Sequence, residues 1–101
     1  MAINIFQAHG QIYYDPTLVE TDKGVYSKNT VMVRRSYKSP NTNKYEYDYI
    51  PIIVRGKQAE YMNRCCNRLD FVYVVGRLIS TNNSSYVEVT EFDMDHVKKG
   101  D

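Results

Sequence analysis

The sequence has no tryptophan, two cysteines, two histidines and no long apolar run, and these shortages exclude several classes of protein. No apolar run approaches the roughly 20 residues of a membrane-spanning helix, and the first ten residues lack the features of a secretory signal. Cys65 and Cys66 are adjacent, so they cannot staple distant segments as disulfides do in small secreted domains. His9 and His96 lack metal-ligand spacing. We expect a cytoplasmic protein without metal or cofactor.

Catalytic motifs are absent from the sequence as well. There is no glycine-rich phosphate loop, no HExxH motif and no Ser-His-Asp arrangement. The acidic residues near the end of the chain are typical of a solvated strand end rather than of a magnesium site; they are Glu88, Glu91, Asp93 and Asp95. We therefore predict that the protein is not an enzyme.

What the sequence does have is tyrosine and an uneven distribution of charge. It contains ten tyrosines and three phenylalanines. The net charge is +1, yet residues 23–77 carry eleven basic residues against four acidic ones, and most of the tyrosines lie in the same segment. This asymmetry favours a surface that faces a polyanion, although bases that merely solvate strands would give the same count.

Hydrophobic periodicity predicts five strands and one short helix in a single domain spanning residues 1–101, with a flexible tail at 95–101. Gly10 marks a bend in the first strand, and the helix is expected to bury Ala59, Met62, and Cys65 with Cys66 or Leu69. The predicted elements, in order, are strands 3–14, 25–37 and 45–55, a helix within 56–69, and strands 70–80 and 86–94. A helix between the third and fourth of five strands is the order of the OB fold, so we predict an all-β, five-stranded Greek-key barrel.

The third predicted strand, YEYDYIPIIVR, places Tyr45, Tyr47 and Tyr49 at alternate positions and therefore on one face. The opposite face is apolar near the barrel and acidic, with Glu46 and Asp48, further out. This predicts a hairpin whose base belongs to the core and whose tip extends into solvent, with an edge or bulge at the proline. The three rings either pack across strands or bind bases.

Three patterns resemble the bacterial and phage single-stranded DNA-binding protein family. The first is GQIYYDP at residues 10–16, the second is an apolar strand running into GKQAE at residues 56–60, and the third is GRL at residues 76–78. They occur in the family's order and cover nearly the whole chain. The resemblance implies an OB fold, a homodimer or homotetramer that pairs through first strands and sheets, and a bacterial or phage-infected cell as the setting.

The resemblance also implies positions for base-stacking aromatics. Two of these positions are aromatic here, Tyr37 and Tyr49. Of the other two, one is occupied by Arg55 and the other falls near Asn83, so neither is aromatic. We expect stacking to be redistributed to Tyr45, Tyr47, Tyr73 or Tyr86. The sequence ends in HVKKGD, without the acidic tail through which family members recruit replication and repair enzymes, so the resemblance does not imply recruitment through a tail.

A protein that holds single strands regardless of sequence needs a cationic groove and flat rings, and tyrosine is suited to a wet surface because its hydroxyl stays hydrated. We predict single-stranded DNA binding during replication or recombination, with replication or recombination proteins as further partners. The predicted contacts are Arg34, Arg35, Tyr37, Lys38, Lys44, Tyr45, Tyr47, Tyr49, Arg55, Arg77 and Tyr86, while Tyr13, Tyr26, Tyr61, Tyr73 and His9 are expected to be structural. The alternative is an accessory module, similar to primosomal replication protein N, that acts mainly through a helicase or initiator.

Overall fold

The computed structural model describes residues 2–95, which form six strands and one helix. The elements are β1 (Phe6–Ile12), β2 (Val19–Thr21), β3 (Gly24–Lys38), β4 (Tyr45–Arg55), α1 (Lys57–Cys65), β5 (Phe71–Ser80) and β6 (Ser85–Met94). Five of the strands and the helix confirm the predicted order. The sequence reading missed β2, a three-residue strand that pairs with the start of β3. The predicted tail lies, beyond Asp95, outside the described residues.

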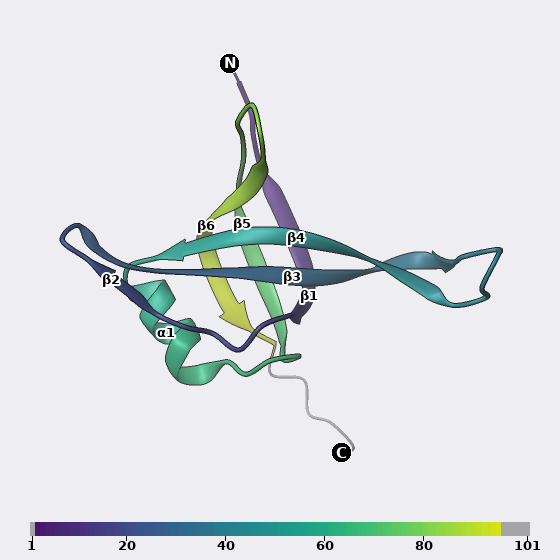
Figure 1. Ribbon diagram of the computed structural model, residues 1–101, viewed down its shortest axis with the longest axis horizontal. Coiled ribbons are helices and arrows are strands. Elements are labelled where there is room, and N and C mark those ends of the chain that lie inside the picture. The colour runs from purple at the N-terminus through teal and green to yellow at the C-terminus, as the bar shows by residue number, and fades with distance from the viewer. Residues whose placement is uncertain (1, 96–101) are drawn as a thin grey trace.

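The strands close into a barrel because β1 changes partner along its length. It pairs with β5 from Phe6 to Gln11, and it reaches β3 at Gln11 and Ile12. The strand order is β1-β5-β6-β4-β3-β2, and the β1–β3 pairing joins the two sides. All pairings are antiparallel except that of β4 with β6. Figure 1 shows the resulting barrel, which confirms the predicted OB fold.

The barrel interior is filled by the alternate, inward-facing residues of five strands and by one side of α1. Its largest fully buried side chains are Ile12, Ile52, Met62, Val31, Val54, Val72, Val74 and Val87. The helix contributes Ala59 and Met62 and packs against β3, β4 and β6. It therefore covers one end of the barrel.

The helix ends earlier than the sequence predicted. It stops at Cys65, and Leu69 has a φ of 73°, which is incompatible with a helical turn. Cys66 is buried, whereas Cys65 is exposed, so the prediction that Cys65 lies on the buried stripe was wrong. Burial raises the pKa of the Cys66 thiol to about 12, so this residue is a neutral core side chain at physiological pH.

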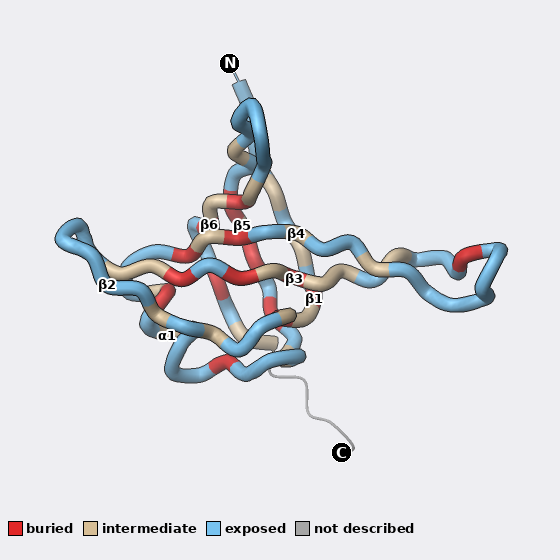
Figure 2. Tube along the Cα trace, viewed as in Figure 1, coloured by how far each residue is buried: buried red, intermediate tan, exposed pale blue. Residues whose placement is uncertain are grey.

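The β3–β4 hairpin extends well beyond the barrel, as Figure 1 shows on the right. Figure 2 shows buried residues within the barrel and mostly exposed residues along the projecting part, which confirms the predicted division of this hairpin. The tip is closed by backbone bonds from Ser39 N to Lys44 O and from Asn43 N to Ser39 O, both 2.8 Å. Pro51 lies one residue before β4 begins to pair with β6, so it occupies the predicted edge position.

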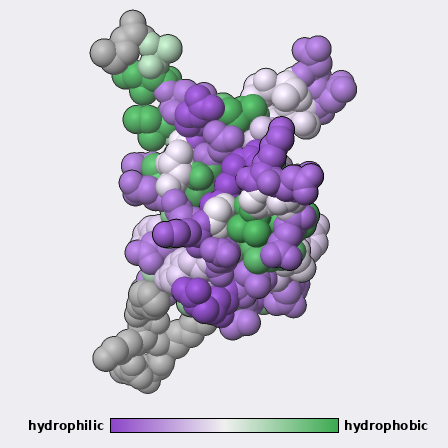
Figure 3. All heavy atoms as spheres, turned by 90° about the vertical axis from the view of Figure 1, so that its left-hand side faces the viewer, coloured by the Kyte–Doolittle hydropathy of each residue, from purple (hydrophilic) through white to green (hydrophobic). Residues whose placement is uncertain are grey.

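The end of the molecule opposite the projecting hairpin is formed by the β2–β3 turn and its surroundings (Figure 1). Figure 3 views it from the side of the β2–β3 turn and shows a largely hydrophilic surface with hydrophobic residues in separate patches. None of the helical segments within residues 2–95 has the length and apolar character that crossing a membrane requires.

Two glycines allow neighbouring strands to approach closely. A Cβ on Gly10 would lie 2.3 Å from the carbonyl oxygen of Met32, at the point where β1 crosses to β3. A Cβ on Gly76 would lie 2.2 Å from the carbonyl oxygen of Glu88, next to a register shift in the β5–β6 ladder. Both distances are shorter than real Cβ contacts, so any side chain would push the strands apart. The bend that the sequence predicted at Gly10 stays a prediction, and what the structure shows there is the close approach of β3.

We predict that Gly76→Ala lowers the free energy of unfolding by about 1–3 kcal/mol, the usual cost of overpacking. Urea unfolding followed by tyrosine fluorescence would measure it. Ser80→Ala, at the exposed end of the same strand, is the control and should change stability by less than about 0.5 kcal/mol. Equal stabilities for Gly76→Ala and wild type would contradict the close approach.

Candidate nucleic-acid interface

One face of the β3–β4 ladder carries a continuous row of rings and cations. Side chains alternate across a strand, so the residues opposite in face to the buried Ser27, Val31 and Ile52 form one surface. We call this surface the outer row; its cross-strand pairs are Tyr26 with Arg55, Lys28 with Ile53, Thr30 with Pro51, Met32 with Tyr49, Arg34 with Tyr47 and Lys38 with Tyr45. It holds four cations and four tyrosines, and no carboxylate is among its own residues, although Glu88 of the neighbouring strand β6 borders it at Arg55. The ladder shifts register between Arg34 and Lys38.

The outer row is long as well as free of acidic side chains. Its β3 side runs from Tyr26 to Lys38, which at the rise of a strand is about 40 Å. It starts on the barrel and continues along the projecting hairpin. Successive rings on β4 are roughly 7 Å apart, which suits bases that are splayed rather than stacked on one another.

Tyr45 is exposed, and its ring is in contact with two cationic side chains. The guanidinium carbon of Arg34 lies 4.3 Å from its centroid and the ammonium nitrogen of Lys38 lies 5.5 Å from it. Both are cation–π distances. A base that stacks on this ring would therefore meet two cations that can neutralise its flanking phosphates.

Tyr49 belongs to a second cluster of rings near the middle of the row, where it pairs with Met32. It is 56% exposed and meets Tyr13 edge to face at 5.4 Å, and Tyr13 meets Tyr14 in the same way at 4.7 Å. The buried amide of Asn29 fixes this loop, since it accepts from Tyr14 N and donates to Tyr14 O. Tyr14 is itself 56% exposed, and sequence reasoning missed it. Its position directly before Asp15-Pro16 was the available signal.

The opposite face of the hairpin carries the acids. Arg35 donates to Asp48 at 2.8 Å and to Glu46 at 3.3 Å, and these three residues form what we call the back cluster. The hydrogen bond from Arg35 lowers the pKa of Asp48 below its usual value, and the same contact raises the pKa of Arg35. The predicted orientation of both acids away from the tyrosines is confirmed. A phosphate contact by Arg35 remains a prediction. To make it, the guanidinium would have to give up its hydrogen bonds to Asp48 and Glu46 and donate to a phosphate instead.

Arg55 and Arg77 meet at the barrel end of the outer row, where both flank Glu88. The distances to the Glu88 carboxylate are 3.7 Å from Arg55 and 3.4 Å from Arg77. Two guanidinium groups on one carboxylate leave this corner with a net positive charge. The fold thus brings Arg77, from β5, beside the row that the sequence had placed on β4.

The remaining predicted contacts lie around the row. Tyr86 is partly buried and shares a cleft with Lys28, Pro51 and Ile53, so it borders the row. Tyr37 is 58% exposed near the end of β3, and Lys44 is exposed at the hairpin tip. Their contacts with nucleic acid remain predictions. Between residues 2 and 95, no three His, Cys, Asp or Glu side chains are grouped closely enough to hold a metal ion.

Two solved structures with a similar arrangement of strands are of single-stranded DNA-binding proteins. The small single-stranded DNA-binding protein from Streptomyces coelicolor superposes with a TM-score of 0.75 at 16% identity, over 95% of this chain and 96% of that one. A deletion mutant of the single-stranded DNA-binding protein from Thermus aquaticus gives a TM-score of 0.77 at 18% identity, over 95% of this chain. The chain shares their OB fold. It spans 42% of the Thermus protein's length.

Comparisons of sequence add nothing to this likeness. No model of a known protein family matches the chain, and no curated protein matches it. At these identities the structural likeness shows the fold, and the chemistry must be argued from the outer row.

We predict that NMR titration of Asp48 in wild type gives a pKa below the usual value of about 3.9, and that Arg35→Ala raises it. Because the folded pKa is depressed, the stabilisation from Asp48 is present above its unfolded pKa and is lost as the pH falls through the folded one. Arg64→Ala, on α1, is the control and should leave the titration unchanged. A pKa that is the same in Arg35→Ala and wild type would show that the back cluster does not form.

Proposed function

We propose that this protein binds single-stranded DNA without marked sequence preference, through tyrosine–base stacking and Lys or Arg contacts with phosphates along the outer row. One observation carries the proposal: the row combines four tyrosines with four cations, both hairpin acids lie on the opposite face, and Glu88, which borders the row, lies between Arg55 and Arg77. A binder of this kind needs a cationic track and flat ring surfaces. The likeness in fold to single-stranded DNA-binding proteins supports the same conclusion.

The free edge of β1 supports a homo-oligomer, which we propose as a homodimer or homotetramer. From Phe6 to Gly10 this strand pairs with β5 on one side, and it reaches β3 only at Gln11 and Ile12. An open strand edge is a template for pairing with another chain. Light scattering should then give a mass of two or four times 11.8 kDa, and a mass of 11.8 kDa would contradict the oligomer.

The biological role that we propose is protection of exposed strands during replication or recombination, in the cytoplasm of a bacterial or phage-infected cell. Such strands are single, have no fixed sequence and must be released again. A surface that works by stacking and by counterion release satisfies all three conditions, because its affinity depends on strand accessibility and on salt.

The test of the stacking surface is fluorescence anisotropy of a labelled oligo(dT) beside a duplex of equal length, at low and moderate salt. Wild type should prefer the single strand, and Tyr45→Ala/Tyr49→Ala should weaken binding by tenfold or more, since stacking contributes about 1–3 kcal/mol per base. Tyr73→Ala removes an equally exposed ring outside the outer row and is the control. Equal affinity for single and double strands would contradict the proposal.

Salt dependence separates the cations of the row from those elsewhere. In the same assay Arg34→Ala should reduce the slope of log affinity against log salt by about one, whereas Arg64→Ala should not. Arg64 lies on α1, over the ring of Tyr61. If all these variants bind like wild type, the tyrosines serve packing, and an accessory role through a helicase or initiator becomes the better explanation.

A further inference from the structure

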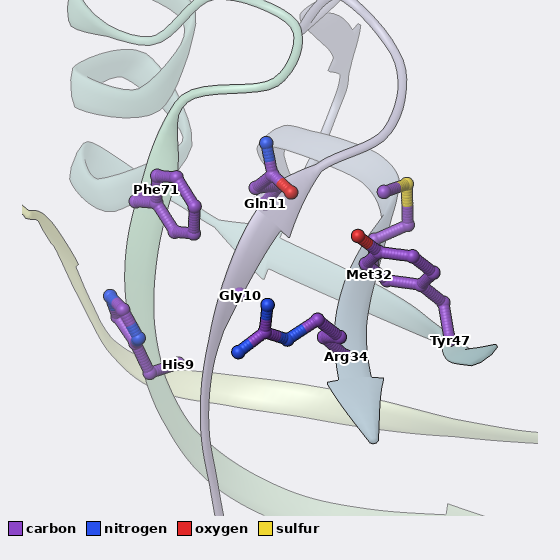
Figure 4. Close-up of a pocket in the computed structure, with 7 residues that line it drawn as sticks. All are labelled: His9, Gly10, Gln11, Met32, Arg34, Tyr47 and Phe71. Atoms are coloured by element: carbon purple, nitrogen blue, oxygen red, sulfur yellow. The ribbon is translucent and has the colours of Figure 1, made fainter. Parts of the chain in front are cut away.

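A pocket lies at the base of the hairpin, where β1, β3, β4 and β5 meet. It has a volume of about 360 Å³ and is lined by His9, Gln11, Met32, Arg34, Tyr47 and Phe71 (Figure 4). We call it the hairpin-base pocket. Arg34 and Tyr47 are a cross-strand pair of the outer row, so the pocket opens directly from the surface proposed to hold the DNA strand.

The walls of the hairpin-base pocket are aromatic on two sides. Figure 4 shows Phe71 on one side of the cavity and Tyr47 on the other. Phe71 is 39% exposed and is stacked on the ring of His9, with centroids 5.4 Å apart and an interplanar angle of 21°. His9 is held in turn by Asp95, with 2.6 Å between Nε2 and Oδ2. Flat, supported walls of this kind suit a planar heterocycle.

The polar groups of the pocket have a fixed arrangement. Gln11 donates its Nε2 to the backbone oxygen of Leu69 at 3.1 Å, and Figure 4 shows its amide oxygen on the cavity side. The guanidinium of Arg34 enters from the opposite side. The cavity therefore offers cationic donors at one end and a carbonyl acceptor at the other, and no carboxylate lines it.

Guanine is the base that matches this arrangement best. Its N7 and O6 are adjacent acceptors that an Arg fork binds in a bidentate manner, and its N2 amino group is a donor at the far end of the purine. Adenine places a donor beside N7, and thymine has no exocyclic amino group. Cytosine has both kinds of group, but its single ring offers less stacking surface between Tyr47 and Phe71.

We propose that the hairpin-base pocket takes one unstacked guanine from the bound strand, with N7 and O6 on Arg34 and the N2 amino group on the amide oxygen of Gln11. This inference rests on the proposed function and adds a local base preference to it. The strand elsewhere is held by stacking and phosphate contacts that ignore sequence. A strand with a guanine would then be held in a preferred register.

The experiment compares, by anisotropy, a labelled oligo(dT) with the same strand carrying a single central dG, dA or dC. We expect the dG strand to bind about fivefold or more tightly than oligo(dT), which corresponds to the lower end of a bidentate contact, and the dA and dC strands to bind within twofold of it. Base analogues assign the contacts: 7-deazaguanine removes N7 and hypoxanthine removes the N2 amino group, so each should lose most of the preference.

Variants of Gln11 and Arg34 are compared by the ratio of their affinity for the dG strand to their affinity for oligo(dT). A variant that weakens binding to both strands equally leaves this ratio unchanged. Gln11→Ala and Arg34→Lys should bring the ratio close to one, and hypoxanthine should bind Gln11→Ala as well as guanine does. Gln7→Ala is the control, because Gln7 lies on the same face of β1 as Gln11, four residues away and outside this pocket, and it should keep the wild-type ratio.

The outcomes separate this inference from the proposed function. Tight binding of oligo(dT) with a dG ratio of one in wild type, or a stronger preference for another base, would overturn the guanine site and leave the proposed function standing. Failure of every single strand to bind would overturn both. A dG preference that survives in both Gln11→Ala and Arg34→Lys would also overturn the site.

Discussion

The pairing of β3 with β4 determines on which face each charged and aromatic side chain of the hairpin lies, because side chains alternate between the two faces of a ladder. The pairing runs from the barrel wall into the hairpin, with a register shift between Arg34 and Lys38, and Lys38 and Tyr45 beyond the shift still lie beside Arg34. The face that is apolar core at Val31 and Ile52 becomes the acidic back cluster at Asp48, and the other face is the outer row. The barrel wall, the hairpin and the outer row are therefore parts of one ladder.

This arrangement separates basic from acidic side chains in a protein whose net charge is only +1. Carboxylates on the same face as a polyanion would repel it, and the fold keeps Glu46 and Asp48 on the back, where Arg35 satisfies them. Exposed ion pairs of this type contribute little to stability. Their value here is positional, because they keep negative charge off the surface that carries Arg34 and Lys38.

The fold was largely predictable from the sequence, because its signals are local. Alternation in YEYDYIPIIVR, the polar tip and Pro51 located the hairpin, and the order of the elements gave the barrel. β2 was missed because three residues are too few for a periodic pattern, and the helix was overextended because nothing local shows that Leu69 adopts a left-handed conformation. The row of tyrosines was also visible in the sequence, because it lies within one strand. The carboxylates that pair with Arg35 and Arg55 were not predicted, because they come from other strands.

The parts that could not be predicted come from contacts across the barrel. Tyr14 joins the row through Asn29, fifteen residues away, and Arg77 joins it through Glu88. The hairpin-base pocket unites side chains of four strands and depends on the β1–β3 register at Gln11 and Met32. A linear pattern contains no information about such registers, so the sequence could not show that His9, Gln11 and Phe71 line one pocket.

Photochemical cross-linking tests the central claim, that DNA lies on the outer row, most directly. An oligonucleotide containing 5-bromodeoxyuridine would be irradiated in complex with the wild-type protein and the adducts mapped by mass spectrometry. If DNA lies on the outer row, we expect adducts on Tyr45, Tyr47 and Tyr49. Adducts confined to tyrosines outside the row, such as Tyr61 and Tyr73, would contradict it.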